Sequence, residues 1–283
     1  MKSAIVYRGR LAPSPTGYLH IGHACTFWQA QERAREAGGQ LVLRIEDLDE
    51  ARCRPEFREA VIEDLSWFGL KWDEGPDIGG PFAPYVQSQR RSHYLDFLRQ
   101  LWEAGAVYGC TCSRKDVAGA ATAPHAENEE LIYPGTCRDL KKATSFEALL
   151  SGEWNVRFRV PDGETIRFQD GRAGEQAAIA GKDFGDFVVW RRDDVPAYHL
   201  AVVADDIAMR ITEVVRGEDL LLSTFRHVLL YRALKVEPPA FYHTQLVEDE
   251  EGRRLAKRHA SLSLRALRMT GADPGEIRSR FGY

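Results

Sequence analysis

"LAPSPTGYLHIGHA", residues 11–24, is the stretch that decides the fold of the amino-terminal part of this 283-residue chain. Its prolines and glycines interrupt regular structure, and an apolar run with helical spacing follows at once. Short apolar segments at 4–7 and at 40–47 (QLVLRIED) flank the loop and the helix, and both are predicted strands. This strand–loop–helix–strand order is a βαβ unit, which is typical of a parallel sheet.

A loop between the carboxyl end of a strand and the amino terminus of a helix is suited to binding an anion. The unpaired N–H groups and the dipole of the helix favour negative charge there, and ligands of open parallel sheets lie at the strand ends. Gly22 lets another molecule approach the backbone, and His20 and His23 can donate hydrogen bonds to phosphate oxygens. A structural loop with two surface histidines fits the spacing alone equally well.

The remaining patterns predict further helices and strands, and the character of the sequence pattern changes near residue 106. Because the middle region differs from what precedes and follows it, we expect it to be an insertion into an α/β domain, in which residues 1–50 and 186–220 share one sheet. The expected elements are helices at 55–68, 88–105 and 224–235, an unpatterned loop at 115–130, an alternating strand at 154–160, and two apolar strands around a turn at 186–206.

Composition and charge exclude several classes of protein. The chain is 44% hydrophobic with a formal net charge of −4, it has no run of eighteen apolar residues, and its start lacks the apolar core of a signal peptide. We therefore expect a cytoplasmic protein with no membrane segment, and a monomer. The segment from Arg253 onward is locally basic, with eight Lys and Arg residues against two acidic ones.

Two clusters outside the first loop carry chemistry. "RRLAKRHAS" (253–261) places Lys257 in a cationic loop that can close over a polyphosphate, although an ordinary basic surface run is the alternative. Cys110, Cys112 and Cys137 lie close together in the sequence, which in a reducing compartment favours a metal site over a disulfide. From the residues alone the fourth ligand of such a site is not evident.

The sequences of several motifs resemble those of a class I aminoacyl-tRNA synthetase of the glutamyl type. "HIGH" at 20–23 follows "APSPTG", and "RLAKR" at 254–258 stands where the family has a lysine-containing loop usually written KMSKS. "LRIEDLD" at 43–49 and "VVRGEDLL" at 214–221 occur in the same order as in that family. Arg254, Ala256 and Arg258 depart from the usual loop, while Lys257 is retained.

The resemblance implies roles for individual residues. ATP, with Mg²⁺, would lie over the first loop, and Lys257 would stabilise the α-phosphate while the carboxylate of L-glutamate attacks it. Which arginine takes which glutamate carboxylate stays open, and a salt bridge with Arg44 is the alternative for Glu46. The implied ATP-binding residues are His20, Gly22, His23 and Lys257, of which His20, His23 and Lys257 are catalytic, and the implied glutamate-binding residues are Arg10, Ala12, Ser14, Glu46, Tyr198 and Arg216.

The cysteine region matches a pattern found in some short glutamyl-type synthetases, C-x-C…Y-x3-C. The resemblance therefore implies one structural zinc ion held by Cys110, Cys112, Tyr133 and Cys137. His125 is the competing fourth ligand, because an imidazole is a better donor than a phenol. A group of buried thiols without zinc is the third possibility.

The fold class implied by the resemblance is α/β, with a Rossmann-type parallel-sheet nucleotide-binding domain of class I synthetases and an inserted α+β, zinc-containing subdomain. The expected segments are 1–105 and 186–250 for the two halves of the catalytic domain, 106–185 for the insertion, which would bind zinc and an RNA stem, and 251–283 for the lysine loop and a short tail without an anticodon-binding domain.

Only 22 residues follow residue 261, too few for an independent domain. This brevity, with the cysteine and tyrosine pattern, resembles the glutamyl-queuosine tRNA(Asp) synthetases. That resemblance implies glutamate activation without tRNA and transfer to queuosine in the anticodon stem-loop of tRNA(Asp). The alternatives are a compact enzyme that charges a tRNA 3′ end and an inactive paralogue that binds tRNA.

Overall fold

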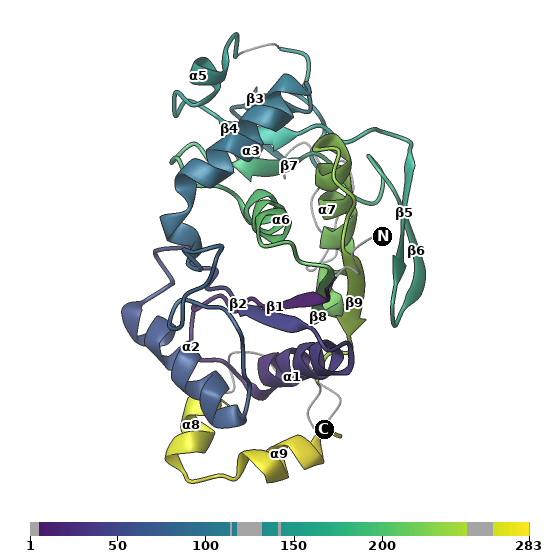
Figure 1. Ribbon diagram of the computed structural model, residues 1–283. Helices are drawn as coiled ribbons and strands as arrows, with labels where there is room; N and C mark the ends of the chain where they lie inside the picture. Colours follow the sequence, from purple (N-terminus) through teal and green to yellow (C-terminus); the bar gives the residue numbers. More distant parts are fainter. Residues whose placement is uncertain (1–5, 114, 118–131, 141–142, 248–262, 283) are drawn as a thin grey trace.

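The computed structural model describes residues 6–113, 115–117, 132–140, 143–247 and 263–282 (Figure 1). The loop at 115–130, His125 and the lysine loop with Lys257 lie wholly or largely outside these residues. In the described part of the chain, no helix combines the length and the apolar character needed to cross a lipid bilayer.

The amino-terminal βαβ unit is present. Strand β1 (Arg8–Leu11) pairs in parallel with β2 (Gln40–Leu43), and α1 (Ile21–Glu36) connects them. The first strand was expected at 4–7, and this is wrong, because β1 begins at Arg8 and Val6 is exposed. The charged side chains of Arg8 and Arg10 hide the strand from a hydrophobic pattern, although both are buried.

The helices of the first hundred residues follow the expected signals. Helix α2 (Pro55–Phe68) starts on Pro55 and ends at Gly69, which adopts φ 96° as a left-handed cap. A short 3₁₀ turn, η1 (Gln87–Gln89), precedes α3 (Arg91–Glu103). Two short carboxy-terminal helices, α8 (Leu264–Met269) and α9 (Pro274–Arg280), pack on α2 at the bottom of Figure 1.

The middle of the chain is largely antiparallel. Strands β3 (Val107–Cys110), β4 (Asn155–Phe158) and β7 (Phe187–Trp190) form one sheet, near the short helix α5 (Phe146–Leu149). Strand β7 pairs with β4 although an expected boundary falls at 185/186. The division of the chain into segments therefore stays a prediction.

A four-stranded sheet joins the middle and the later part of the chain. Its order is β6 (Gly174–Ile179), β5 (Thr165–Asp170), β9 (Ala240–Thr244), β8 (Glu213–Gly217), and the β8–β9 and β5–β9 pairs are parallel. Residues 1–50 and 186–220 were expected to share one sheet, but β1–β2 and β8–β9 form separate ladders. A backbone hydrogen bond of 2.9 Å from Thr212 N to Arg8 O links the two sheets where β1 and β8 begin.

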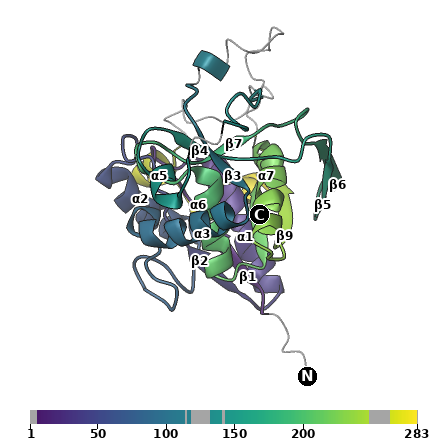
Figure 2. The same ribbon diagram turned by 90° about the horizontal axis from the view of Figure 1, so that it is seen from above.

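The segment 186–206 corrects another expectation. Its first half is strand β7, but its second half is helix α6 (Tyr198–Ala208), and not a strand. The helix is buried among α3, α7 (Leu221–Ala233) and β7, as Figures 1 and 2 show. A helix that is apolar nearly all round has no polar stripe, so a short apolar run of this kind resembles a buried strand. Helix α7 confirms the helix expected at 224–235.

Candidate active site

One cavity of about 310 Å³ collects the described residues that the sequence assigned to ATP and glutamate. It lies where β1 ends, α1 and α6 begin, and β8 ends. Carboxyl ends of parallel strands and a helix amino terminus thus meet at the cavity. The predicted residues that line it are Arg10, Ala12, Ser14, His20, Gly22, His23, Glu46, Tyr198 and Arg216.

The two histidines shape the amino terminus of α1. His20 is the N-cap, and its Nδ1 accepts a hydrogen bond from Gly22 N at 3.1 Å. His23 Nδ1 accepts from His20 N at 3.4 Å, and the ring centroids are 3.8 Å apart. Because both Nδ1 atoms act as acceptors, the neutral rings carry their protons on Nε2. A Cβ on Gly22 would lie 3.0 Å from the His20 ring, so glycine permits this cap.

Arg216 is a buried cation surrounded by neutral groups. Its Nε donates to His243 Nε2 at 3.2 Å, and its Nη2 donates to Thr224 Oγ1 at 2.7 Å. Nη1 lies 3.2 Å from His227 Nδ1 and 3.4 Å from the Tyr198 hydroxyl. Arg216 is 5% exposed, and a buried charge is normally paired with an opposite one. Its surroundings suit a carboxylate ligand.

Arg10 also lines the cavity, in a more acidic environment than Arg216. Its Nη1 donates to Val215 O at 2.7 Å, and its Nε is 3.7 Å from Asp206 Oδ1. Burial lowers the pKa of Arg10, although the negative charge of Asp206 opposes this shift. The negative charge of a bound substrate carboxylate would also favour the charged form of Arg10 and so offset the cost of its burial.

Glu46 both pairs with Arg44 and lines the cavity. Its carboxylate accepts from Arg44 Nη2 at 2.9 Å, so the expected salt bridge exists, and Glu46 also lines the cavity. Burial raises the pKa of Glu46, and the charge of Arg44 opposes the rise. The side chain is therefore held by Arg44 and can still face a substrate ammonium group.

Sequence reasoning missed the side chains that support the two arginines and Glu46. No motif marks them, and the only available signal was charge or polarity inside apolar runs, such as the paired aspartates at the end of α6. The missed residues are Asp205, Asp206, Thr224, His227 and His243, all less than 4% exposed.

A second, larger cavity of about 770 Å³ adjoins the first. The two share Ser14, Glu46 and Tyr198 as lining residues. The outer wall of the second cavity is basic and polar, and it reaches the predicted metal ligand Cys112. Its basic lining residues are Arg52, Arg157, Arg191 and Arg192.

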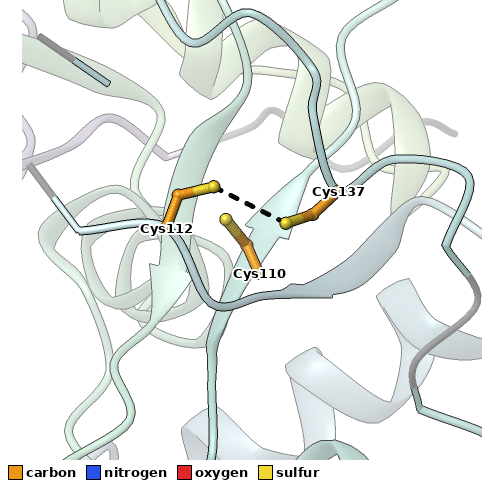
Figure 3. Close-up of side chains that lie close together, drawn as sticks. All are labelled: Cys110, Cys112 and Cys137. Carbon is orange, nitrogen blue, oxygen red and sulfur yellow. Dashed lines mark hydrogen bonds between the residues drawn. The ribbon is translucent and has the colours of Figure 1, made fainter. Parts of the chain in front are cut away.

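The predicted zinc ligands come together from two separate segments, one at the end of β3 and one at 133–137. The thiol groups of Cys110, Cys112 and Cys137 point toward one another (Figure 3), with all three Sγ atoms within 4.8 Å and the Cys112–Cys137 pair at 3.6 Å. The Tyr133 hydroxyl is 3.3 Å from Cys110 Sγ and 3.5 Å from Cys112 Sγ. Tetrahedral zinc, with Zn–S near 2.3 Å and Zn–O near 2.0 Å, needs S–S and S–O separations of roughly 3.8 and 3.5 Å. The Cys112–Cys137 separation and the two separations from the Tyr133 hydroxyl are close to these values.

The surroundings favour ionised sulfur at Cys137, whereas burial raises the pKa of Cys112. Arg157 Nε donates to Cys110 Sγ at 3.3 Å, and its guanidinium lies 4.1 Å from the centre of the Tyr133 ring. Burial would raise the pKa of Cys137, but hydrogen bonds, above all from Tyr133, outweigh it and lower that pKa to about 6. A thiolate is the form that binds a metal. His125, the competing ligand, lies outside the described residues.

Known proteins share both this sequence and this fold. Residues 7–278 match the family model of the class I tRNA synthetases (E and Q), catalytic domain. The chain is 50% identical over 271 residues to the glutamyl-Q tRNA(Asp) synthetase of Nitratidesulfovibrio vulgaris, an alignment that covers 95% of this chain and 83% of that protein. It is 48% identical over 277 residues to the glutamyl-Q tRNA(Asp) synthetase of Symbiobacterium thermophilum, covering 97% and 85%.

A solved structure has the same fold. The crystal structure of a glutamate tRNA ligase from Elizabethkingia meningosepticum, in complex with its amino acid, superposes with a TM-score of 0.77 at 31% identity. The match covers 98% of this chain and 53% of that one, so this chain spans about half the length of the ligase. The fold is therefore a class I synthetase fold with mixed α/β sheets.

Proposed function

This chain belongs to the family of glutamate- and glutamine-type class I tRNA synthetases, and from that premise we propose that it activates L-glutamate with ATP and transfers it to queuosine in the anticodon loop of tRNA(Asp). Two relatives that carry this activity in their names are about half identical and align over more than four fifths of their lengths. The single observation that carries the proposal is the cavity in which two buried arginines, Glu46 and the α1 terminus meet.

The polar groups of that cavity match the charges of glutamate. Arg10 and Arg216 would each bind one carboxylate, since a guanidinium pairs with a carboxylate in a two-bond fork. Glu46 would bind the ammonium group, and the hydroxyls of Ser14 and Tyr198 would complete the site together with the backbone at Ala12. A buried cation such as Arg216, which has no acidic partner among the residues that the structure describes, favours an anionic ligand over a neutral amide.

The first step is adenylation. ATP, with Mg²⁺ as its counter-ion, would lie with its phosphates at the amino terminus of α1, where Nε2–H groups of His20 and His23 and the backbone at Gly22 can donate to oxygen. The α-carboxylate oxygen attacks the α-phosphorus, the bond to the β-phosphate oxygen breaks, and pyrophosphate leaves. Lys257 would stabilise the negative charge that develops on the α-phosphate.

The second step is ester formation. A hydroxyl of the queuosine cyclopentene diol attacks the activated carbonyl carbon, AMP leaves with the bonding electrons, and the hydroxyl proton passes to the departing phosphate or to solvent. The second cavity opens on the first through Ser14, Glu46 and Tyr198, and its arginines suit the phosphates of an RNA stem-loop. Because ATP and tRNA would be its substrates, we propose a cytoplasmic location for this activity.

Zinc completes the proposal. Cys110, Cys112, Tyr133 and Cys137 would hold one ion, which would act structurally by tying two loops of an inserted subdomain together. Cys112 also borders the second cavity, so the site supports the wall that faces the acceptor.

Pyrophosphate exchange tests the first step directly. Purified protein with ATP and radiolabelled pyrophosphate is expected to form labelled ATP only when L-glutamate is added, in the absence of any RNA. L-glutamine and L-aspartate serve as controls. Glutamine has an amide in place of the side-chain carboxylate, and the side chain of aspartate is one methylene shorter. If the addition of L-glutamate produced no labelled ATP, the proposal would be refuted.

A further inference from the structure

A buried row of polar groups leads from Arg216 away from the cavity. His243, on β9, is fully buried and stands directly behind Arg216. Asp170, at the end of β5, is 1% exposed and stands behind His243. Neither residue lines the cavity, so neither would touch a bound substrate.

The hydrogen bonds fix how His243 is oriented. Asp170 Oδ2 accepts from His243 Nδ1 at 2.6 Å and from the backbone N of His243 at 3.1 Å. Asp170 Oδ1 is held in turn by the backbone N–H groups of Arg172 at 3.0 Å and Ala173 at 2.8 Å. Because Nδ1–H donates to Asp170, a neutral imidazole has an unprotonated Nε2, which accepts from Arg216 Nε and lies 3.0 Å from Thr224 Oγ1.

The ring also separates two opposite charges. Burial, followed by the nearby positive charge of Arg216, lowers the pKa of His243 to about 4, so the ring is neutral near pH 7. The carboxylate of Asp170 thus stays one imidazole away from the guanidinium. A carboxylate in direct contact with Arg216 would form a salt bridge and compete with an anionic ligand.

We propose that Asp170 and His243 are positioning residues that hold the guanidinium of Arg216 toward the cavity with its charge uncompensated, and that they thereby set the affinity for a substrate carboxylate. This inference rests on the proposed function. His243 anchors the Nε edge of Arg216, while the contacts at the terminal nitrogens include two long ones, 3.4 Å to the Tyr198 hydroxyl and 3.5 Å to Leu220 O. A carboxylate can replace those two long contacts with a pair of short, parallel hydrogen bonds.

Two amide substitutions at one position separate the two hydrogen bonds of His243. His243→Asn keeps a donor near the Nδ1 position, facing Asp170, but lacks an acceptor that reaches Arg216. His243→Gln extends its amide oxygen to the Nε2 position and keeps that acceptor. Phe241→Leu is the packing control, because Phe241 is buried on the same strand and stacks near His243 without a polar contact.

The readout is the KM for glutamate against the KM for ATP in pyrophosphate exchange, with glutamate affinity from calorimetry and the melting temperature beside it. His243→Asn is expected to raise the glutamate KM about tenfold, as for one lost hydrogen bond to a charged group, and to leave the ATP KM within about twofold. His243→Gln should stay within about threefold of the parent. Phe241→Leu should lower the melting temperature without raising the glutamate KM.

The outcomes separate this inference from the proposed function. A parent protein without glutamate-dependent exchange would refute the proposed function. A parent with normal exchange would leave that function standing, and the positioning role alone would then fail if His243→Asn left the glutamate KM unchanged. It would also fail if both KM values rose equally, or if His243→Gln behaved like His243→Asn.

Discussion

Replacing Arg216 with Gln removes the buried charge while keeping most of the side-chain volume. In the proposed complex a substrate carboxylate makes two charge-assisted hydrogen bonds, each contributing about 1.5–3 kcal/mol. The two long contacts that it replaces, to Tyr198 and to Leu220 O, return part of that energy when the ligand leaves. The net loss is roughly 3 kcal/mol, so Arg216→Gln should weaken glutamate binding on the order of a hundredfold.

Glutamate saturation in pyrophosphate exchange and calorimetric titration both measure this effect. Arg232→Gln is the matched control, because Arg232 lies on the surface of α7 and pairs with Glu164 there. The melting temperature of Arg216→Gln should equal or exceed that of the parent, since the buried charge has only neutral described partners. Parental glutamate affinity in Arg216→Gln would show that Arg216 does not bind the substrate.

Three further outcomes are expected. Lys257→Ala should slow pyrophosphate exchange by two to three orders of magnitude, about 3–4 kcal/mol, without changing calorimetric glutamate affinity; a parental rate would place the lysine loop elsewhere. Cys137→Ser should lose the zinc found by elemental analysis while Cys53→Ser keeps it; equal zinc in both would reject the ligand set. Burial raises the pKa of Asp64 to about 6, against a partly opposing Arg268, so the folded protein keeps a proton that the unfolded chain releases near pH 4. The free energy of unfolding should therefore fall as pH rises from about 4 to 6, and Asp64→Asn should remove that fall in urea titrations; the same fall in both proteins would contradict this assignment.

The sequence alone was sufficient to predict residues that line the cavity. The proline and glycine loop, the two histidines, Glu46 and Arg216 all stand within motifs whose spacing is fixed by where a strand ends or a helix begins. All the described members of the predicted substrate set line one cavity. The three cysteines and Tyr133 likewise meet in space, because two short segments bring them to one point.

The sequence was insufficient where burial and long-range pairing decide the structure. The segment of helix α6 was expected to be a strand because its central residues are a short apolar run. Strand β1 was displaced because its arginines are buried against distant acidic groups, such as Arg8 against Glu74. The pairing of β5 with β9 and the contact between Asp170 and His243 join residues more than seventy positions apart. No local pattern encodes such contacts.

The acceptor is the central claim, and one measurement tests it most directly. Queuosine-containing tRNA(Asp) whose 3′ adenosine has been removed is incubated with the protein, ATP and radiolabelled glutamate, next to intact tRNA(Asp) that lacks queuosine. The trimmed, queuosine-containing tRNA should accept label and the intact, queuosine-free tRNA should accept none. Charging of tRNA(Glu) that disappears when its 3′ adenosine is removed would contradict the account and identify an enzyme that acts on the 3′ end.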